Sequence, residues 1–88
     1  ILGMMNNKDH IEYISYFKDK ISSLTTVDIP NQPNAINGED LMKKLKNLKN
    51  VNYKKSVKEA INSIDLKDND IIIITGSLYL AGEVLNLN

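Results

Sequence analysis

Residues 75–84 carry the pattern most suggestive of ligand binding. The Gly76-Ser77 pair follows an apolar run at residues 71–74 and precedes a helical pattern of apolar positions that includes Leu78. This order predicts Ser77 at a helix N-terminus on the carboxyl edge of a sheet, where open α/β sheets bind ligands. Free N–H groups and the positive end of the helix dipole favour a carboxylate or phosphate there, with the Ser hydroxyl as an extra donor. The competing interpretation is that Ser77 is only an N-cap.

Lys8 and Asp9 form a second candidate group. They follow the apolar residues 1–5, which are typical of a buried strand, so they are expected at the same carboxyl edge and could face the same crevice as Ser77. The alternative is that Asp9 caps a helix while Lys8 lies in solvent. His10, the single histidine, is expected on the helix surface and not as a catalytic base.

Hydrophobic spacing predicts the first two helices and the strand between them. From Asp9, apolar residues recur every three to four positions as far as Ile21, which predicts an amphipathic helix of about three to four turns. Residues 23–29 are rich in β-branched side chains and predict a strand, followed by a loop at residues 31–34. Asn37 or Gly38 can then cap a second helix whose apolar stripe is Leu41, Leu45 and Leu48.

The second half predicts another strand, helix and strand. Residues 51–54 are expected to be a strand, and Ser56 with Glu59 forms a capping-box signature that opens a helix. Residues 71–74 are four consecutive isoleucines, which predicts a central parallel strand covered on both faces. We therefore expect an α/β fold: one domain over residues 1–88, a three-layer, Rossmann-like arrangement with a mostly parallel sheet.

Composition excludes several classes of protein. The 88 residues hold 11 Lys+Arg and 11 Asp+Glu, for a net charge of zero, so a nucleic-acid binder is not expected. The chain has no cysteine and one histidine, so no metal site is expected. No segment approaches a membrane span, and we expect a cytoplasmic protein that does not bind a membrane.

The motifs together resemble the end of the C-terminal domain of the folylpolyglutamate synthase family, including its bifunctional dihydrofolate synthase form. The resemblance rests on the apolar start running through Gly3 into Lys8-Asp9, on the Pro-containing loop, and on residues 73–84, in matching order along essentially the whole chain. It implies the C-terminal domain of the Mur ligase superfamily. It also implies that the chain is a piece lacking the opening strand of that domain and the upstream ATPase domain.

The resemblance further implies an ATP-dependent ligase that activates a folate or dihydropteroate carboxylate as an acyl phosphate, which L-glutamate then attacks. The serine matched by Ser77 is associated with the glutamate side of the site, which favours a binding role for Ser77 and Gly76; Lys8 and Asp9 receive no role from the family. ATP and Mg²⁺ would serve the full-length enzyme and would not be bound by this piece alone. The phosphate-binding loop, the Mg²⁺ ligands and the D-G-A-H-N-P segment of the family are absent, so the 88 residues by themselves are expected to be inactive. The alternative is a free-standing α/β binding or interaction module without catalysis.

Overall fold

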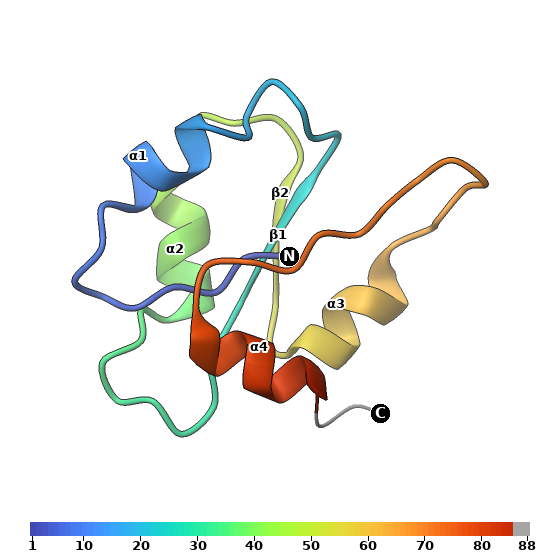
Figure 1. Cartoon of the computed structure of the whole chain (residues 1–88). Helices are drawn as coiled ribbons and strands as arrows, with labels where there is room; N and C mark the ends of the chain where they lie inside the picture. The colour runs from blue at the N-terminus through green and yellow to red at the C-terminus, as the bar shows by residue number, and fades with distance from the viewer. Residues whose placement is uncertain (86–88) are drawn as a thin grey trace.

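The computed structural model describes residues 1–85, which form a small α/β structure with two regular parallel strands and four helices. In chain order the elements are α1 (His10–Ser15), β1 (Leu24–Val27), α2 (Gly38–Lys44), β2 (Val51–Lys54), α3 (Val57–Ser63) and α4 (Leu78–Leu85) (Figure 1). Among these residues no helix has the length and apolar character that a membrane crossing requires.

The parallel layer extends beyond its two regular strands. β1 pairs with β2 in parallel, with Leu24 opposite Val51 and Val27 opposite Lys54. Leu2 forms one parallel bridge with Thr26 on β1 and another with Thr75, so residues 1–3 lie between β1 and the segment at residues 73–75 (Figure 1). The resulting order across the layer is β2, β1, residues 1–3 and residues 73–75.

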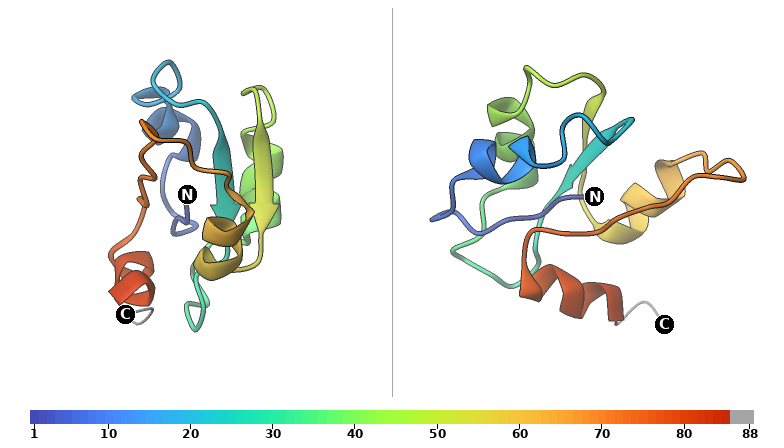
Figure 2. Two further views of the ribbon diagram at one scale, coloured as in Figure 1. Left: turned by 90° about the vertical axis from the view of Figure 1, so that its right-hand side faces the viewer. Right: turned by 45° about the horizontal axis from the view of Figure 1, so that its top comes forward.

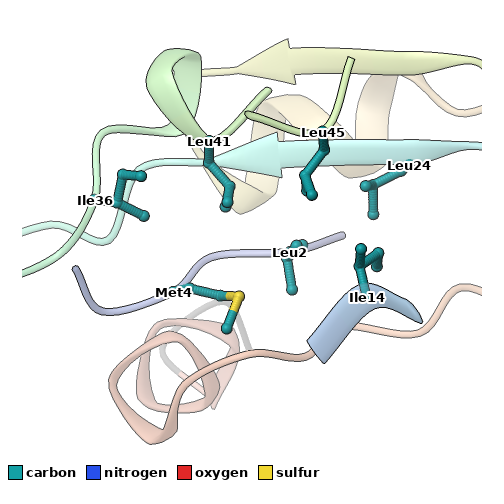
Figure 3. Packing of buried hydrophobic residues seen from close by; sticks show 7 residues of the cluster. All are labelled: Leu2, Met4, Ile14, Leu24, Ile36, Leu41 and Leu45. Carbon is teal, nitrogen blue, oxygen red and sulfur yellow. The ribbon is translucent and has the colours of Figure 1, made fainter. Parts of the chain in front are cut away.

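Two hydrophobic clusters cover the layer, one on each face. Leu2 and Leu24 belong to the first cluster, whereas Ile1 and Val27 belong to the second. Successive side chains along a strand point to opposite faces of a sheet, so even-numbered Leu2 and Leu24 lie on one face and odd-numbered Ile1 and Val27 on the other. The layer therefore lies between the two clusters. Figure 3 shows the first cluster converging between residues 1–5, β1, α1 and α2; its members are Leu2, Met4, Ile14, Leu24, Ile36, Leu41 and Leu45. The second cluster includes residues of α3 and α4, which are the gold and red helices of Figure 2.

The caps of α2 and α3 follow from their sequences. The Asn37 side chain accepts a hydrogen bond from the Glu39 N–H at 2.8 Å, which confirms Asn37 as the cap of α2. The Ser56 hydroxyl oxygen accepts the Glu59 N–H at 3.2 Å, as the capping box predicts. The Glu59 carboxylate, however, reaches past Ser56 and accepts the Lys55 N–H at 3.3 Å.

Two predicted elements differ from the structure. The first helix ends at Ser15, well short of three turns, and Ile11 is 62% exposed where the predicted stripe required burial. The expected central strand at residues 71–74 is also wrong: Ile71 is 85% and Ile73 55% exposed. The reason is that this segment pairs on one side only, with residues 1–3, so it forms the margin of the layer and not its centre.

Candidate functional site

Four segments of the parallel layer end at one edge, where ligands bind in open α/β sheets. Because all the pairings between them are parallel, their carboxyl ends point the same way. The residues that follow these ends are Met4 after the first segment, Asp28 after β1, Lys55 after β2 and Gly76 after Thr75. The candidate site is therefore this carboxyl edge.

Gly76 and Ser77 form a tight turn from the layer into α4. Gly76 has a φ of +114°, a conformation that residues with a Cβ rarely adopt. A Cβ at Gly76 would also collide with the Gly3 carbonyl oxygen and approach the Leu2 side chain to 2.9 Å. Glycine at position 76 thus allows the turn to lie against the end of the first segment.

Ser77 caps α4, as its position in the sequence predicts. Its hydroxyl oxygen accepts the Tyr79 N–H at 3.1 Å, and its carbonyl accepts the Ala81 N–H at 3.2 Å. A serine hydroxyl has one proton to donate as well as lone pairs, so this cap leaves the proton available to an incoming acceptor. Ser77 is half-buried at the edge of the layer. The arrangement is compatible with binding an anion.

The structure places Lys8 and Asp9 on an exposed turn that leads into α1. The Asp9 carboxylate accepts the Glu12 N–H at 3.0 Å, so Asp9 is the N-cap of α1, and Lys8 is exposed. Within residues 1–85 no hydrogen bond joins either side chain to Gly76 or Ser77. A binding role for Lys8 and Asp9 stays a prediction.

His10 is buried, contrary to the expectation of a surface residue. It is 3% exposed, and its Nε2 lies 2.9 Å from the Met5 carbonyl oxygen while its Nδ1 lies 3.4 Å from the Lys44 Nζ. A carbonyl accepts and an ammonium donates, so the pattern describes a neutral ring with its proton on Nε2. His10 therefore ties the start of α1 to α2 and to residues 1–5.

Asp28 organises the middle of the edge and was missed by sequence reasoning. Its Oδ1 accepts the Gly38 N–H at 2.7 Å and its Oδ2 accepts the Tyr53 hydroxyl at 2.7 Å. The hydrogen bond to Asp28, followed by burial and the negative charges nearby, raises the pKa of Tyr53 to about 12. The sequence feature that could have indicated Asp28 is its position, because it directly follows a buried β-branched run and precedes Pro30.

A cavity of about 330 Å³ opens beside Asp28. Its walls come from the ends of β1 and β2 and from α3 and α4; the residues are Asp28, Pro30, Lys55, Ser56, Val57 and Glu83. Its volume is at the lower end of the range for small-molecule sites, and two carboxylates and one ammonium border it. The cavity and the Gly76-Ser77 turn lie on the same edge.

Two common signatures of metal and phosphate binding are missing from the part of the chain that the structure describes. Within residues 1–85 no group of three or more His, Asp or Glu side chains is arranged to hold a metal ion. No glycine-rich phosphate loop with a following Lys occurs in the sequence.

Comparison with protein families gives one match: the Mur ligase, glutamate ligase domain, over residues 1–78. The chain belongs to the Mur ligase family. No curated protein and no solved structure matches the chain. The Mur ligases are a superfamily of ATP-dependent ligases, so this chain is a domain of a member of that superfamily. The match spans the parallel layer and ends at Leu78, so it includes the Gly76-Ser77 turn.

Proposed function

We propose that this Mur ligase domain is the C-terminal part of an ATP-dependent folylpolyglutamate synthase, in which it helps to bind the incoming L-glutamate. The observation that carries the proposal is Ser77, which stands at the N-terminus of α4, on the carboxyl edge of the layer, in a chain of the Mur ligase family. A helix N-terminus attracts a carboxylate, and the Ser77 proton adds a directed hydrogen bond.

The remaining chemistry of such an enzyme would come from outside these residues. We propose that an upstream ATPase domain of the same polypeptide binds ATP and Mg²⁺ and, with the folate or dihydropteroate substrate, activates the acceptor carboxylate. The domain would be Rossmann-like and three-layered, with its missing opening strand supplied by preceding residues, and the enzyme would be cytoplasmic. The 88 residues alone would then have no ligase activity.

The test is steady-state kinetics of the ligase that carries this domain, with three substitutions at one position. Ser77→Ala removes both the helix cap and the hydrogen-bond donor. It should raise KM for glutamate by about tenfold or more, because a hydrogen bond to a charged group is lost. KM for ATP should change little. Ser77→Thr keeps the hydroxyl and should restore binding. Ser77→Asp keeps the cap but places a negative charge where the carboxylate binds, so glutamate binding should be weaker still.

A matched control separates binding from folding. Ser15→Ala removes an exposed hydroxyl that donates to a carbonyl within α1, far along the chain from the carboxyl edge. It should leave both KM values unchanged. Equal effects of Ser77→Ala on glutamate and ATP, or full glutamate affinity in Ser77→Asp, would contradict the proposal.

A further inference from the structure

A pair of hydroxyl groups joins α1 to the last residue before the Gly76-Ser77 turn. The Tyr13 hydroxyl oxygen lies 2.5 Å from the Thr75 Oγ1, which is hydrogen-bonding distance, and either group can donate. The two residues are 62 positions apart in the chain. Thr75 directly precedes Gly76, so α1 contacts the chain at the point where the layer ends and the turn begins.

Thr75 is attached to the layer on one side only. Its N–H donates to the Ile1 carbonyl at 3.0 Å, and its carbonyl accepts the Gly3 N–H at 3.3 Å. Both bonds lead to the first segment, because Thr75 lies at the margin of the layer. Bonds to a single neighbour leave a marginal segment free to rotate about the line that joins the two. The Tyr13 hydroxyl comes from the face that α1 covers, which is a different direction, so it opposes this rotation.

Gly76 does not fix the direction of Ser77 by itself. Glycine has more backbone freedom than any other residue, and Gly76 has a φ of +114°. The direction of Ser77 is therefore set by the anchors on either side of the glycine. After the turn, the anchor is Leu80, which is fully buried in the second cluster. Before the turn, the anchor is Thr75, whose side chain bonds to Tyr13.

The Tyr13 hydroxyl is itself held in place by α1. The backbone N–H of Tyr13 donates to the carbonyl of Asp9, the N-cap of α1, at 3.0 Å. The ring packs against the first cluster and beside Phe17, with the ring centroids 5.6 Å apart. A tyrosine side chain has only two rotatable bonds before its ring, so the packing of the ring also fixes the hydroxyl. The bond to Thr75 is partly buried, and shielding from water strengthens it.

We propose that Tyr13 and Thr75 are positioning residues for the candidate site. Their hydrogen bond fixes the end of the layer in front of Gly76, and thereby the direction in which Ser77 presents its hydroxyl to an incoming carboxylate. Neither hydroxyl touches the ligand, because each acts through the backbone of the turn. The link to glutamate binding rests on the proposed function of Ser77, whereas the link between Tyr13 and the turn stands without it.

Steady-state kinetics of the ligase that carries this domain test the role in binding. Tyr13→Phe and Thr75→Val each remove one hydroxyl and should raise KM for glutamate by about three- to tenfold, which corresponds to one hydrogen bond. KM for ATP should not change. The double variant should bind glutamate no more weakly than either single variant, because the two hydroxyls form one bond. Thr75→Ser keeps the hydroxyl and should restore the native KM. Tyr16→Phe, which removes an exposed hydroxyl at the end of α1, is the matched control.

Hydrogen exchange in the same ligase without ligands tests the positioning directly. The Tyr79 amide donates to the Ser77 hydroxyl and the Ala81 amide to the Ser77 carbonyl, so both amides report on the turn. The two variants that lack a hydroxyl should speed exchange of these amides by about threefold or more, and Thr75→Ser should not. Residues 57–63 of α3 pack on the opposite face of the layer and should exchange as in the native enzyme.

The two measurements distinguish failure of the positioning role from failure of the glutamate site. Faster exchange at the turn with a native KM for glutamate would support the positioning role and contradict a glutamate site at Ser77. Native exchange at the turn in both Tyr13→Phe and Thr75→Val would overturn the inference, whatever Ser77→Ala does to glutamate binding. Equal increases in KM for glutamate and ATP, together with faster exchange throughout residues 57–63, would also overturn it, because the hydroxyl pair would then only stabilise the domain.

Discussion

Asp28 joins three elements through one carboxylate. It follows β1, accepts the first N–H of α2 from Gly38, and accepts the hydroxyl of Tyr53 on β2. Thr26 adds a buried hydrogen bond from its hydroxyl to the Gly38 carbonyl at 2.6 Å. Gly38 itself has no room for a side chain, because a Cβ there would lie 2.7 Å from the Tyr53 ring. These contacts fix the entry of α2 relative to the parallel layer.

The Tyr53 hydroxyl gives this junction a measurable pH dependence. Its pKa is raised from 10.0 to about 12, chiefly by the hydrogen bond to Asp28. The folded protein therefore holds the phenolic proton more tightly than the unfolded chain does. The contribution to the free energy of unfolding is fully present below pH 10.0 and is lost as pH rises from 10.0 to about 12.

Urea unfolding of the native chain and of Tyr53→Phe at several pH values should therefore give a difference in stability that shrinks across this window. Tyr16→Phe is the control, because Tyr16 is 67% exposed. The Asp28→Asn variant should lower the pKa of Tyr53 in an absorbance titration of tyrosinate, since the negative acceptor is gone. An unchanged Tyr53 pKa in that variant would show that Asp28 is not the cause.

At the scale of elements, two glycines, one just before α4 and one within it, have opposite requirements. Gly76, just before the helix, has a positive φ and lies against the Gly3 backbone, whereas Gly82 within the helix has open space around it. Gly76→Ala should lower the free energy of unfolding by about 1–3 kcal/mol, because the turn becomes strained. Gly82→Ala should raise it by about 0.5–1 kcal/mol, since alanine favours a helix interior.

Chemical denaturation of the two alanine variants beside the native chain measures both effects. The pair is informative because the chemical change is identical and only the backbone setting differs. A Gly76→Ala variant as stable as the native chain would mean that the turn can rearrange without cost. A loss of stability in Gly82→Ala would mean that position 82 is packed against something.

Elements with strong local signals were predicted from sequence, and those that depend on distant neighbours were not. The strand at Leu24–Val27, the strand at Val51–Lys54 and the caps Asn37 and Ser56 follow from β-branched runs and from short-range hydrogen bonding. The isoleucines at residues 71–74 have equally strong local character. Their burial depends on which segments flank them, which composition does not encode. The same holds for His10, whose burial arises from its contacts with Met5 and Lys44.

At the scale of the whole molecule, the candidate site was predicted in part. The carboxyl edge and the turn at Gly76 and Ser77 follow from the order of strand, glycine and helix. Asp28, Tyr53 and Glu83 reach this edge from three separate elements, so only the assembled layer brings them near one another. The opposite edge of the layer, beside Ile1, opens into a groove of about 830 Å³ that both polar and apolar residues line. The described residues of the Mur ligase domain thus form a hollow at each end of the parallel layer.

In the 88-residue chain by itself, the amino group of Ile1 links the stability of the layer to pH. Burial lowers its pKa from 8.0, so the folded chain binds this proton less tightly than the unfolded chain. Between the lowered pKa and pH 8.0 the unfolded state carries more protons, and the free energy of unfolding must rise with pH. Below the lowered pKa the buried charge lowers the free energy of unfolding by its full amount. Above pH 8.0 the amino group is neutral in both states and this destabilisation is absent.

Acetylation of Ile1 should remove this dependence, because an amide carries no proton to lose. Urea unfolding of the free and the acetylated chain at the same series of pH values gives two curves, and their difference cancels the contributions of all other titrating groups. The acetylated chain should be the more stable at low pH, and the gap should narrow as pH rises to 8.0. Parallel curves across the range would mean that the amino group is solvated in the folded chain. The end of the ladder between β1 and residues 73–75 would then be open to water as well.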